Sequence, residues 1–300
     1  MMDKKPENYV DINKIYDKNI LITGGTNGIG EETAYSLGRL GANVYIHGRD
    51  TEKGEKIVNH LQNDIGTDSK FFKCDFSNLD DVYELSKSIK KEINEIDVLI
   101  NNAGVMLWGN KTGSKYLEYT FVTNYLSTFV ITIELIPLLL NTNTQSQIIF
   151  TSSSSHRHIN ELHIENVNES RNNWESYARS KLANIMLSLF LSRKLDENKI
   201  VTRAVHPGMI TNSKILRNVS GIFEGIGSIM TYIPLPGVCS KSKGAATLIN
   251  AINSDAYSGV YYNRFNPEMP SILAQDMQVQ DMLWDYSIDI TDSNQQEYIN

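Results

Sequence analysis

The sequence predicts an α/β fold built as a single domain: a doubly wound parallel sheet of about seven strands, flanked by helices. Two observations predict it. Short apolar runs alternate with segments of helical periodicity, and the first apolar run passes directly into a glycine-rich turn. Because no linker interrupts this pattern in the 300 residues, we expect one domain over residues 19–290, with short tails at 1–18 and 291–300.

The glycine-rich turn follows the first predicted strand, Ile20-Leu21-Ile22, and opens the first helix. Its glycines let the backbone bend, approach a ligand closely and pack the new helix against its strand. The unpaired N–H groups at the helix start then attract a phosphate. The alternative is an ordinary tight turn between a strand and a helix. The phosphate-binding interpretation assigns these residues to a cofactor site: Gly24, Thr26, Asn27, Gly28, Ile29 and Gly30.

The first half of the chain continues with helices and strands in regular order. The first helix runs to about Leu40 and ends at Gly41, because glycine readily adopts the left-handed conformation that closes many helices. Periodicity and apolar runs then predict a strand at Ala42–Gly48, a helix at Thr51–Ile65, a strand at Lys70–Lys73, a helix at residues 79–93 and a strand at Asp97–Ile100. The carboxyl ends of such strands are where an open α/β sheet binds its ligands.

The run Phe121–Leu140 is almost wholly apolar and long enough to cross a membrane. Asn124, Glu134 and Pro137 argue against that interpretation and favour a buried helix. The N-terminus has no apolar run after its charged residues, so we expect neither a signal peptide nor a membrane anchor.

Three further strands are expected in the second half, at Gln147–Thr151, Ile200–Val205 and Gly259–Tyr262. Between the last two, the segment Ser213–Val238 mixes large apolar residues with several glycines. This composition suits a mobile substrate lid.

Composition excludes several classes of function. With 35 acidic and 28 basic residues the net charge is −7, which argues against a nucleic-acid surface. Cys74 and Cys239 lie far apart, so we expect neither a disulfide framework nor a zinc site, and a reducing, cytoplasmic location. His156 and His158 have no second cluster of ligands to complete a metal site, and none is predicted.

A serine run, Ser152–Ser155, follows the strand that ends at Thr151, and Tyr177 and Lys181 come later, four residues apart. The run is either low-complexity filler or the edge of an active site. At helical spacing Tyr177 and Lys181 share one face. We expect the ammonium to lower the pKa of the phenol, so that Tyr177 can exchange a proton with a substrate oxygen.

Four short motifs occur in a fixed order along the chain: T-G-x-x-x-G-I-G at 23–30, N-N-A-G at 101–104, Y-A-R-S-K at 177–181 and H-P-G at 206–208. In this order they resemble the short-chain dehydrogenase/reductase family, which implies a Rossmann-type fold and an oxidoreductase. The long loop 154–176 and the stretches at 242–247 and 274–287 are similar to the retinol dehydrogenase-like branch. The resemblance runs from about Ile20 to Ser287.

The resemblance implies a role for each matching residue. Ser153 would be the catalytic serine that polarises the substrate oxygen, with Ser152 and Ser154 as alternatives. Lys181 would also bind the nicotinamide ribose, and Asn124 would retain a water that links Lys181 to solvent. With Tyr177, these are the catalytic residues that we expect.

Other matching positions imply cofactor contacts. Asp75 stands where relatives place an Asp against the adenine ring, although it can equally cap the helix that starts near Leu79. The remaining implied contacts, in the N-N-A-G and P-G motifs, are Asn102, Ala103, Gly104, Pro207, Gly208 and Thr211.

The end of the second strand bears on the choice of cofactor. Gly48 stands where NAD-preferring relatives tend to carry Asp, and Arg49 follows it, so the resemblance implies NADP(H). A surface charge is the alternative for Arg49. A second basic residue, often found in NADP-binding relatives just before the middle glycine, is replaced here by Asn27.

We therefore expect an NADP(H)-dependent oxidoreductase that transfers a hydride between the nicotinamide and a carbonyl or alcohol of an apolar substrate, such as a retinoid, a steroid or a lipid aldehyde or ketone. The alternative is a dinucleotide-binding scaffold or sensor with vestigial turnover. Relatives often use the helix at Phe121–Leu140 in dimer contacts, so the resemblance also implies a homodimer.

Overall fold

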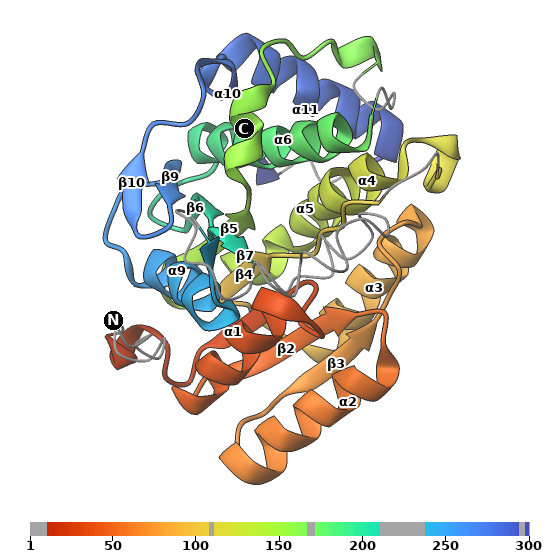
Figure 1. Cartoon of the computed structure of the whole chain (residues 1–300). Helices are drawn as coiled ribbons and strands as arrows, with labels where there is room; N and C mark the ends of the chain where they lie inside the picture. Colours follow the sequence, from red (N-terminus) through yellow and green to blue (C-terminus); the bar gives the residue numbers. More distant parts are fainter. Residues whose placement is uncertain (1–10, 108–110, 167–171, 211–237, 294–297, 300) are drawn as a thin grey trace.

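The computed structural model describes residues 11–107, 111–166, 172–210, 238–293 and 298–299 (Figure 1). The strands are β1 (Asn19–Ile22), β2 (Asn43–Gly48), β3 (Lys70–Lys73), β4 (Val98–Asn101), β5 (Ser146–Thr151), β6 (Ile200–His206), β7 (Met209–Ile210), β8 (Val238–Cys239), β9 (Val260–Asn263) and β10 (Asn266–Glu268). The helices are α1 (Gly28–Arg39), α2 (Thr51–His60), α3 (Leu79–Glu92), α4 (Tyr119–Phe121), α5 (Ser127–Leu140), α6 (Asn173–Lys194), α9 (Lys241–Asn253), α10 (Ile272–Gln275) and α11 (Met277–Thr291). The expected lid, Ser213–Val238, lies outside the described residues except for its last residue.

The main sheet has the strand order β10-β9-β6-β5-β4-β1-β2-β3. All its strands from β3 across to β9 run parallel, which confirms the doubly wound parallel sheet. β10 was not expected, and it pairs antiparallel with β9 at the edge. Its three residues are exposed and include Pro267, so no apolar run marks it in the sequence.

Helices cover both faces of the sheet, and each face has its own apolar core (Figure 1). The strands alternate between the two: Ile20 and Ile22 of β1 join the core beneath α1, α2 and α9, whereas Leu21 joins the core beneath α3, α5 and α6. The predicted end of the first helix is confirmed, because Gly41 follows it with a left-handed φ of +85°.

The apolar run at Phe121–Leu140 forms α4, a π-helical turn at Val122–Leu126 and α5. The segment Tyr119–Leu140 is long and apolar enough to cross a membrane, and 89% of its most apolar window is buried inside the protein. The expectation of a buried helix is confirmed. Glu134 lies at its margin, where its carboxylate accepts a hydrogen bond from Lys90 at 2.6 Å.

The C-terminal helix α11 packs onto α6 and reaches α5 through Trp284 (Figure 1). Trp284 stacks on Phe190 with ring centroids 4.4 Å apart and meets the edge of Phe129 at 5.1 Å. The hydroxyls of Tyr125 and Ser287 lie 2.7 Å apart, within hydrogen-bonding distance. The chain itself therefore covers part of the helical surface that the resemblance assigned to a dimer partner.

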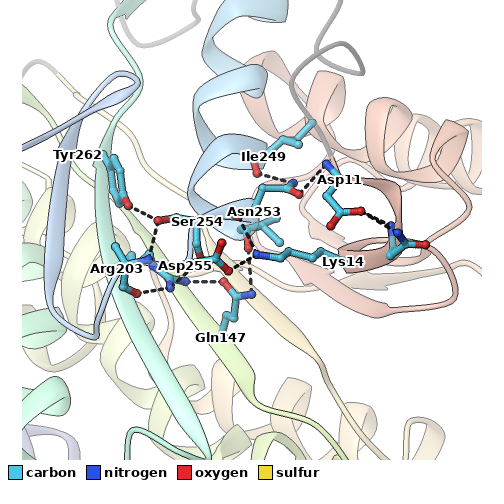
Figure 2. Close-up of polar contacts among 12 residues, drawn as sticks. Asp11, Lys14, Gln147, Arg203, Ile249, Asn253, Ser254, Asp255 and Tyr262 are labelled. Carbon is cyan, nitrogen blue, oxygen red and sulfur yellow. Dashed lines mark hydrogen bonds and ion pairs between the residues drawn. The ribbon is translucent and has the colours of Figure 1, made fainter.

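Residues 11–18 of the expected N-terminal tail are folded against the domain, as Figure 2 shows in part. Ile15 is fully buried. The Asp11 N–H donates to the side-chain oxygen of Asn253, the last residue of α9, at 3.0 Å. Lys14 donates to the Asn253 carbonyl at 3.0 Å and forms an ion pair with Asp255. A polar stretch without periodicity thus docks through side chains that meet only in the folded chain.

The same network includes Arg203 of β6, which is fully buried (Figure 2). Its guanidinium donates to the side-chain oxygen of Gln147 at 2.6 Å and to the carbonyls of Ser254 and Ala256 at 3.1 and 2.7 Å. Burying a cation requires such partners. This network joins β5, β6 and the end of α9 at the amino-terminal end of the sheet, opposite the strand ends expected to bind ligands.

Candidate active site

A cavity of about 570 Å³ opens at the carboxyl ends of the parallel strands. It lies where the strand order reverses on either side of β1, the place where open α/β sheets bind ligands. Each strand from β1 to β6 contributes a lining residue at or just beyond its end: Gly24, His47, Asp75, Asn102, Thr151 and His206.

The glycine turn forms one wall, and its glycines have distinct roles. Gly24 has φ +69°, and a Cβ there would lie 2.8 Å from the Cα of Ala103. A Cβ at Gly30 would lie 2.3 Å from the Gly24 carbonyl oxygen, so Gly30 permits close packing and does not line the cavity. Gly28 has φ +63° and faces open space. The side chain of Asn27 makes no capping hydrogen bond at the start of α1.

Arg49 and Asp75 lie at the end of the cavity formed by β2 and β3. The guanidinium donates to the Tyr119 hydroxyl at 3.2 Å and lies 4.0 Å from the Asp75 carboxylate. Asp75 accepts the N–H of Ser77. The residue that caps α3 is Asn78, whose side chain accepts the N–H of Asp80, so capping by Asp75 is wrong.

Gly48 is required by packing against the glycine turn. A Cβ at Gly48 would lie 2.5 Å from the side-chain oxygen of Thr26. An acidic residue at position 48 would therefore displace Thr26, which itself lines the cavity.

The N-N-A-G motif bridges β1 and β4. The Asn102 amide donates to the carbonyls of Thr23 and Gly24 at 3.1 and 3.3 Å, and the Thr23 hydroxyl accepts the N–H groups of Asn102 and Ala103, each at 3.0 Å. A Cβ at Gly104 would lie 3.1 Å from the Lys181 Nζ. The small residues thus leave room for a ligand beside Lys181.

Tyr177 and Lys181 share one face of α6, as their spacing predicts. The Lys181 Nζ lies 5.7 Å from the centroid of the Tyr177 ring and donates to the Thr151 carbonyl at 3.0 Å. The Tyr177 hydroxyl is hydrogen-bonded to the Ser153 side chain. The three predicted side chains therefore meet in one cavity.

The geometry distinguishes between the three candidate serines. The Ser152 hydroxyl is buried and donates to the Lys181 carbonyl at 2.7 Å. Ser154 is exposed at the start of a 3-10 turn, Ser154–His158. Ser153 alone of these three is hydrogen-bonded to Tyr177, and its Oγ also accepts the N–H of Ser155 at 3.2 Å.

Asn124 lies behind the cavity wall, in the π-helical turn between α4 and α5. Its side-chain oxygen accepts the Val105 N–H at 2.7 Å, and its amide donates to the Val105 carbonyl at 2.9 Å and to the Ser180 hydroxyl at 3.0 Å. The side chain thus joins the loop after β4 to the helix that carries Tyr177 and Lys181. Insertion of a π turn into an α-helix is frequent at functional sites.

The pKa of Tyr177 differs from the expectation. Burial raises the pKa of Tyr177, and the hydrogen bond with Ser153 opposes that shift without reversing it. The expectation of a lowered pKa for Tyr177 is therefore wrong for this cavity, because the effect of burial is the largest. Lys181 is buried as well, and burial lowers its own pKa to about 8.

Pro207 and Gly208 line the cavity after β6, and Gly208 has φ +94°. Thr211, the third predicted residue of this segment, lies outside the described residues. His206 precedes them, and burial lowers its pKa to about 4.

Several lining residues were not predicted from the sequence. His47 accepts the Gly24 N–H through Nδ1 and lies 3.2 Å from the Cys74 carbonyl through Nε2, so it holds the glycine turn against β3. Trp174 lines the cavity three residues before Tyr177, with the ring centroids 6.3 Å apart. The i, i+3 spacing on one helix was the signal that could have found it. The others include Phe76, Met106, Leu107, Thr123 and Met209.

Comparison with known proteins agrees with this arrangement. The sequence pattern of the short chain dehydrogenase family matches residues 18–221. Human retinol dehydrogenase 11 is 30% identical over 279 residues, which cover 91% of this chain and 85% of that protein.

Solved structures show the same fold. A protein from Mycobacterium paratuberculosis is 24% identical with a TM-score of 0.73, covering 94% of this chain and 97% of that one. A short chain dehydrogenase from Escherichia coli CFT073, complexed with NADPH, is 22% identical with a TM-score of 0.67, covering 86% and 100%. With the matched pattern spanning most of the chain, the protein belongs to the short-chain dehydrogenase/reductase family of NAD(P)-dependent oxidoreductases that act on CH–OH groups.

Proposed function

We propose that this chain transfers a hydride between NADP(H) and a carbonyl or alcohol of an apolar substrate, such as a retinoid, a steroid or a lipid aldehyde or ketone. The observation that carries the proposal is the convergence of Ser153, Tyr177 and Lys181 on one cavity that is also lined by the glycine turn and Arg49.

The lining fits a dinucleotide. Gly28 faces open space at the N-terminus of α1, where backbone N–H groups favour a phosphate. Asn102, Ala103 and Gly104 leave a gap between this turn and Lys181. When bound, NADP(H) supplies or accepts the hydride, and Lys181 would hold the nicotinamide ribose.

Tyr177 would exchange the proton with the substrate oxygen. Because burial raises its pKa, Tyr177 is protonated at neutral pH and is ready to donate as a carbonyl is reduced. Ser153 would polarise the same oxygen. Its Oγ accepts the Ser155 N–H, which leaves the hydroxyl proton available to donate.

Lys181 and Asn124 would support this exchange from behind. The Lys181 ammonium, anchored on the Thr151 carbonyl, favours negative charge that develops on the Tyr177 oxygen. Asn124 would keep Lys181 in register by joining Val105 to Ser180, one residue before the lysine. That Asn124 retains a water linking Lys181 to solvent stays a prediction.

The preference for NADP(H) over NAD(H) is supported by Arg49. A guanidinium at the cavity end formed by β2 and β3 suits a 2′-phosphate, and Gly48 supplies no carboxylate to bind a 2′-hydroxyl. The Escherichia coli relative of known structure was complexed with NADPH. Arg49 is more than half exposed, so it can move toward a bound phosphate.

An apolar substrate is supported by the residues around Tyr177. Met106, Leu107, Trp174 and Met209 line the cavity. Aromatic and thioether side chains contact flat or irregular apolar groups well. The relative from human is named a retinol dehydrogenase, which is consistent with this class.

We also propose a cytoplasmic location, because Cys74 and Cys239 are both buried as thiols, which suits a reducing compartment. Cell fractionation should recover the protein in the soluble fraction without detergent. Recovery with the membranes would contradict this location.

The decisive experiment is turnover with NADPH and a panel of retinal, steroid ketones and aliphatic aldehydes, in the wild type and in Tyr177→Phe. The substitution keeps the ring and removes the proton donor, so turnover should fall roughly 10²–10⁴-fold while the Kd for NADPH stays unchanged. Lys181→Ala should weaken both turnover and NADPH binding, and Ser153→Ala mainly turnover. A wild type that binds NADPH and reduces no member of the panel would instead favour the scaffold or sensor function.

A further inference from the structure

The turn that follows Ser153 contains a buried histidine without a role in the proposed chemistry. His156 is fully buried, although it lies in a polar stretch of serines and basic residues. Its ring meets the edge of the Tyr261 ring of β9, with centroids 5.2 Å apart and planes at 69°.

Both ring nitrogens of His156 have backbone partners. Nδ1 lies 2.7 Å from the Ser153 carbonyl oxygen, and the Ser271 N–H donates to Nε2 at 3.2 Å. A carbonyl only accepts and an N–H only donates, so the ring is neutral and carries its proton on Nδ1. Burial agrees with this state, because it lowers the pKa of His156. With both nitrogens engaged, the ring joins the backbone of Ser153 to that of Ser271.

Arg157 makes a second connection between the same two segments. Its guanidinium donates to the Glu268 carboxylate and to the Met269 carbonyl, both at 2.8 Å. The 3-10 turn after Ser153 is thus held against the segment 268–271, which connects β10 to α10 (Figure 1).

The position of the Ser153 hydroxyl follows closely from its backbone. The position of Oγ relative to the backbone depends on a single side-chain torsion, χ1. The Ser155 N–H and the Tyr177 hydroxyl contact Oγ on two sides. A shift of the Ser153 carbonyl would therefore move Oγ away from Tyr177. Small displacements of this kind lower turnover more than they lower binding.

We propose that His156 is a positioning residue: by bridging the Ser153 carbonyl and the Ser271 N–H, it holds the Ser153 hydroxyl in line with Tyr177. The inference rests on the proposed function, because it assigns His156 a part in the placement of the catalytic serine. In this inference, β10 and the segment that leads into α10 support the serine turn.

Three variants separate the two hydrogen bonds. In His156→Asn the amide nitrogen takes the place of Nδ1 and can still donate to the Ser153 carbonyl. In His156→Gln the amide oxygen reaches the place of Nε2 and keeps only the Ser271 contact, and His156→Phe keeps only the ring packing on Tyr261. Because the bridge needs both ends, we expect kcat roughly 10–100-fold lower in all three variants, with the Kd for NADPH unchanged in each.

A double-mutant cycle distinguishes positioning from general damage. In a Ser153→Ala background the hydroxyl is gone, so His156→Gln should lower kcat no further, whereas damage to the fold would add to the loss. Because this cycle uses Gln, it remains informative if the Phe variant fails to fold. His163→Asn is the matched control: it lies in the same loop, half-exposed, and pairs with Glu161 and Glu165.

Additive losses in the cycle would overturn the inference, as would wild-type kcat in His156→Gln or in His156→Asn. Each of these results leaves the proposed function intact as long as the wild type reduces a carbonyl with NADPH. An inactive wild type that binds NADPH would overturn the proposed function, and the inference with it.

Discussion

The Lys181 ammonium donates to the Thr151 carbonyl at 3.0 Å, at the end of the strand that leads into the serine turn. Burial beside this one neutral acceptor lowers the pKa of Lys181 to about 8, because a buried ammonium loses its hydration. Lys181 therefore changes charge in a range of pH that enzyme assays can reach.

Carbonyl reduction should depend on this ionisation. Lys181 is charged below about pH 8 and neutral above it, and the charged form is the one that supports Tyr177. We expect kcat/KM to be level at lower pH and to fall up to tenfold per pH unit above about 8. Tyr177 does not add to this fall, since burial raises its pKa. The pH profile of kcat/KM tests the expectation, and a level profile to pH 10 would contradict it.

The Arg49 guanidinium donates a hydrogen bond to the Tyr119 hydroxyl at 3.2 Å, so both residues should affect cofactor binding. Arg49→Ala should weaken NADPH binding by about 1–3 kcal/mol, the contribution of a charge-assisted hydrogen bond, and leave NADH binding unchanged. Tyr119→Phe should have a smaller effect in the same direction, because it removes a contact that orients the guanidinium and leaves its charge in place. Calorimetric Kd values for both cofactors test this expectation. Lys87→Ala is the control, because Lys87 pairs with Glu84 on the surface of α3. Equal Kd values for NADPH and NADH in the wild type would refute the preference.

Trp174 should select among substrates. Its ring lines the cavity next to Tyr177 and meets the edge of the His158 ring, with centroids 6.0 Å apart. An aromatic pair contributes about 0.5–1.5 kcal/mol, so Trp174→Ala should lower kcat/KM for planar conjugated aldehydes roughly 2–12-fold relative to saturated ones. Trp174→Phe should restore most of the preference. Parallel kcat/KM measurements on the two substrate classes decide the matter, and an equal loss for both would remove Trp174 from substrate selection.

The packing of α11 bears on the oligomer. Trp284, stacked on Phe190 and edge-on to Phe129, occupies helical surface that a partner would otherwise cover, so we expect a monomer rather than a dimer through α5. Trp284→Ala should cost about 3–5 kcal/mol in the free energy of unfolding and promote self-association through the uncovered apolar surface. Denaturant unfolding and sedimentation velocity measure the two effects. A wild type that sediments as a dimer would show that α11 leaves another contact available.

Most of the parallel strands were predictable because they contain apolar runs buried on both faces, as in Ile20-Leu21-Ile22. β10 was not, because its residues are exposed and its place depends on the pairing with β9 and on the contact between Arg157 and Glu268. The docking of residues 11–18 likewise depends on long-range contacts, such as Lys14 with Asp255. Local patterns do not contain such contacts.

The arrangement of the site followed a similar rule. Residues at the ends of parallel strands must meet at one edge of the sheet, so the sequence could bring Gly24, Asn102 and Ser153 together. The raised pKa of Tyr177 was missed because the spacing to Lys181 shows proximity and not burial. The supporting contacts of His156 were missed because Ser271 lies 115 residues away in the sequence.

The residues of the two edge strands, β3 and β10, oppose pairing with other molecules. An unpaired strand edge invites the strand of another molecule, and proline and charged side chains oppose such pairing. β10 presents Pro267, which has no N–H, and Glu268, whereas β3 at the other edge begins with Lys70 and ends with Lys73. Neither border offers a flat apolar template, so the folded protein should tolerate high concentration without forming β-aggregates.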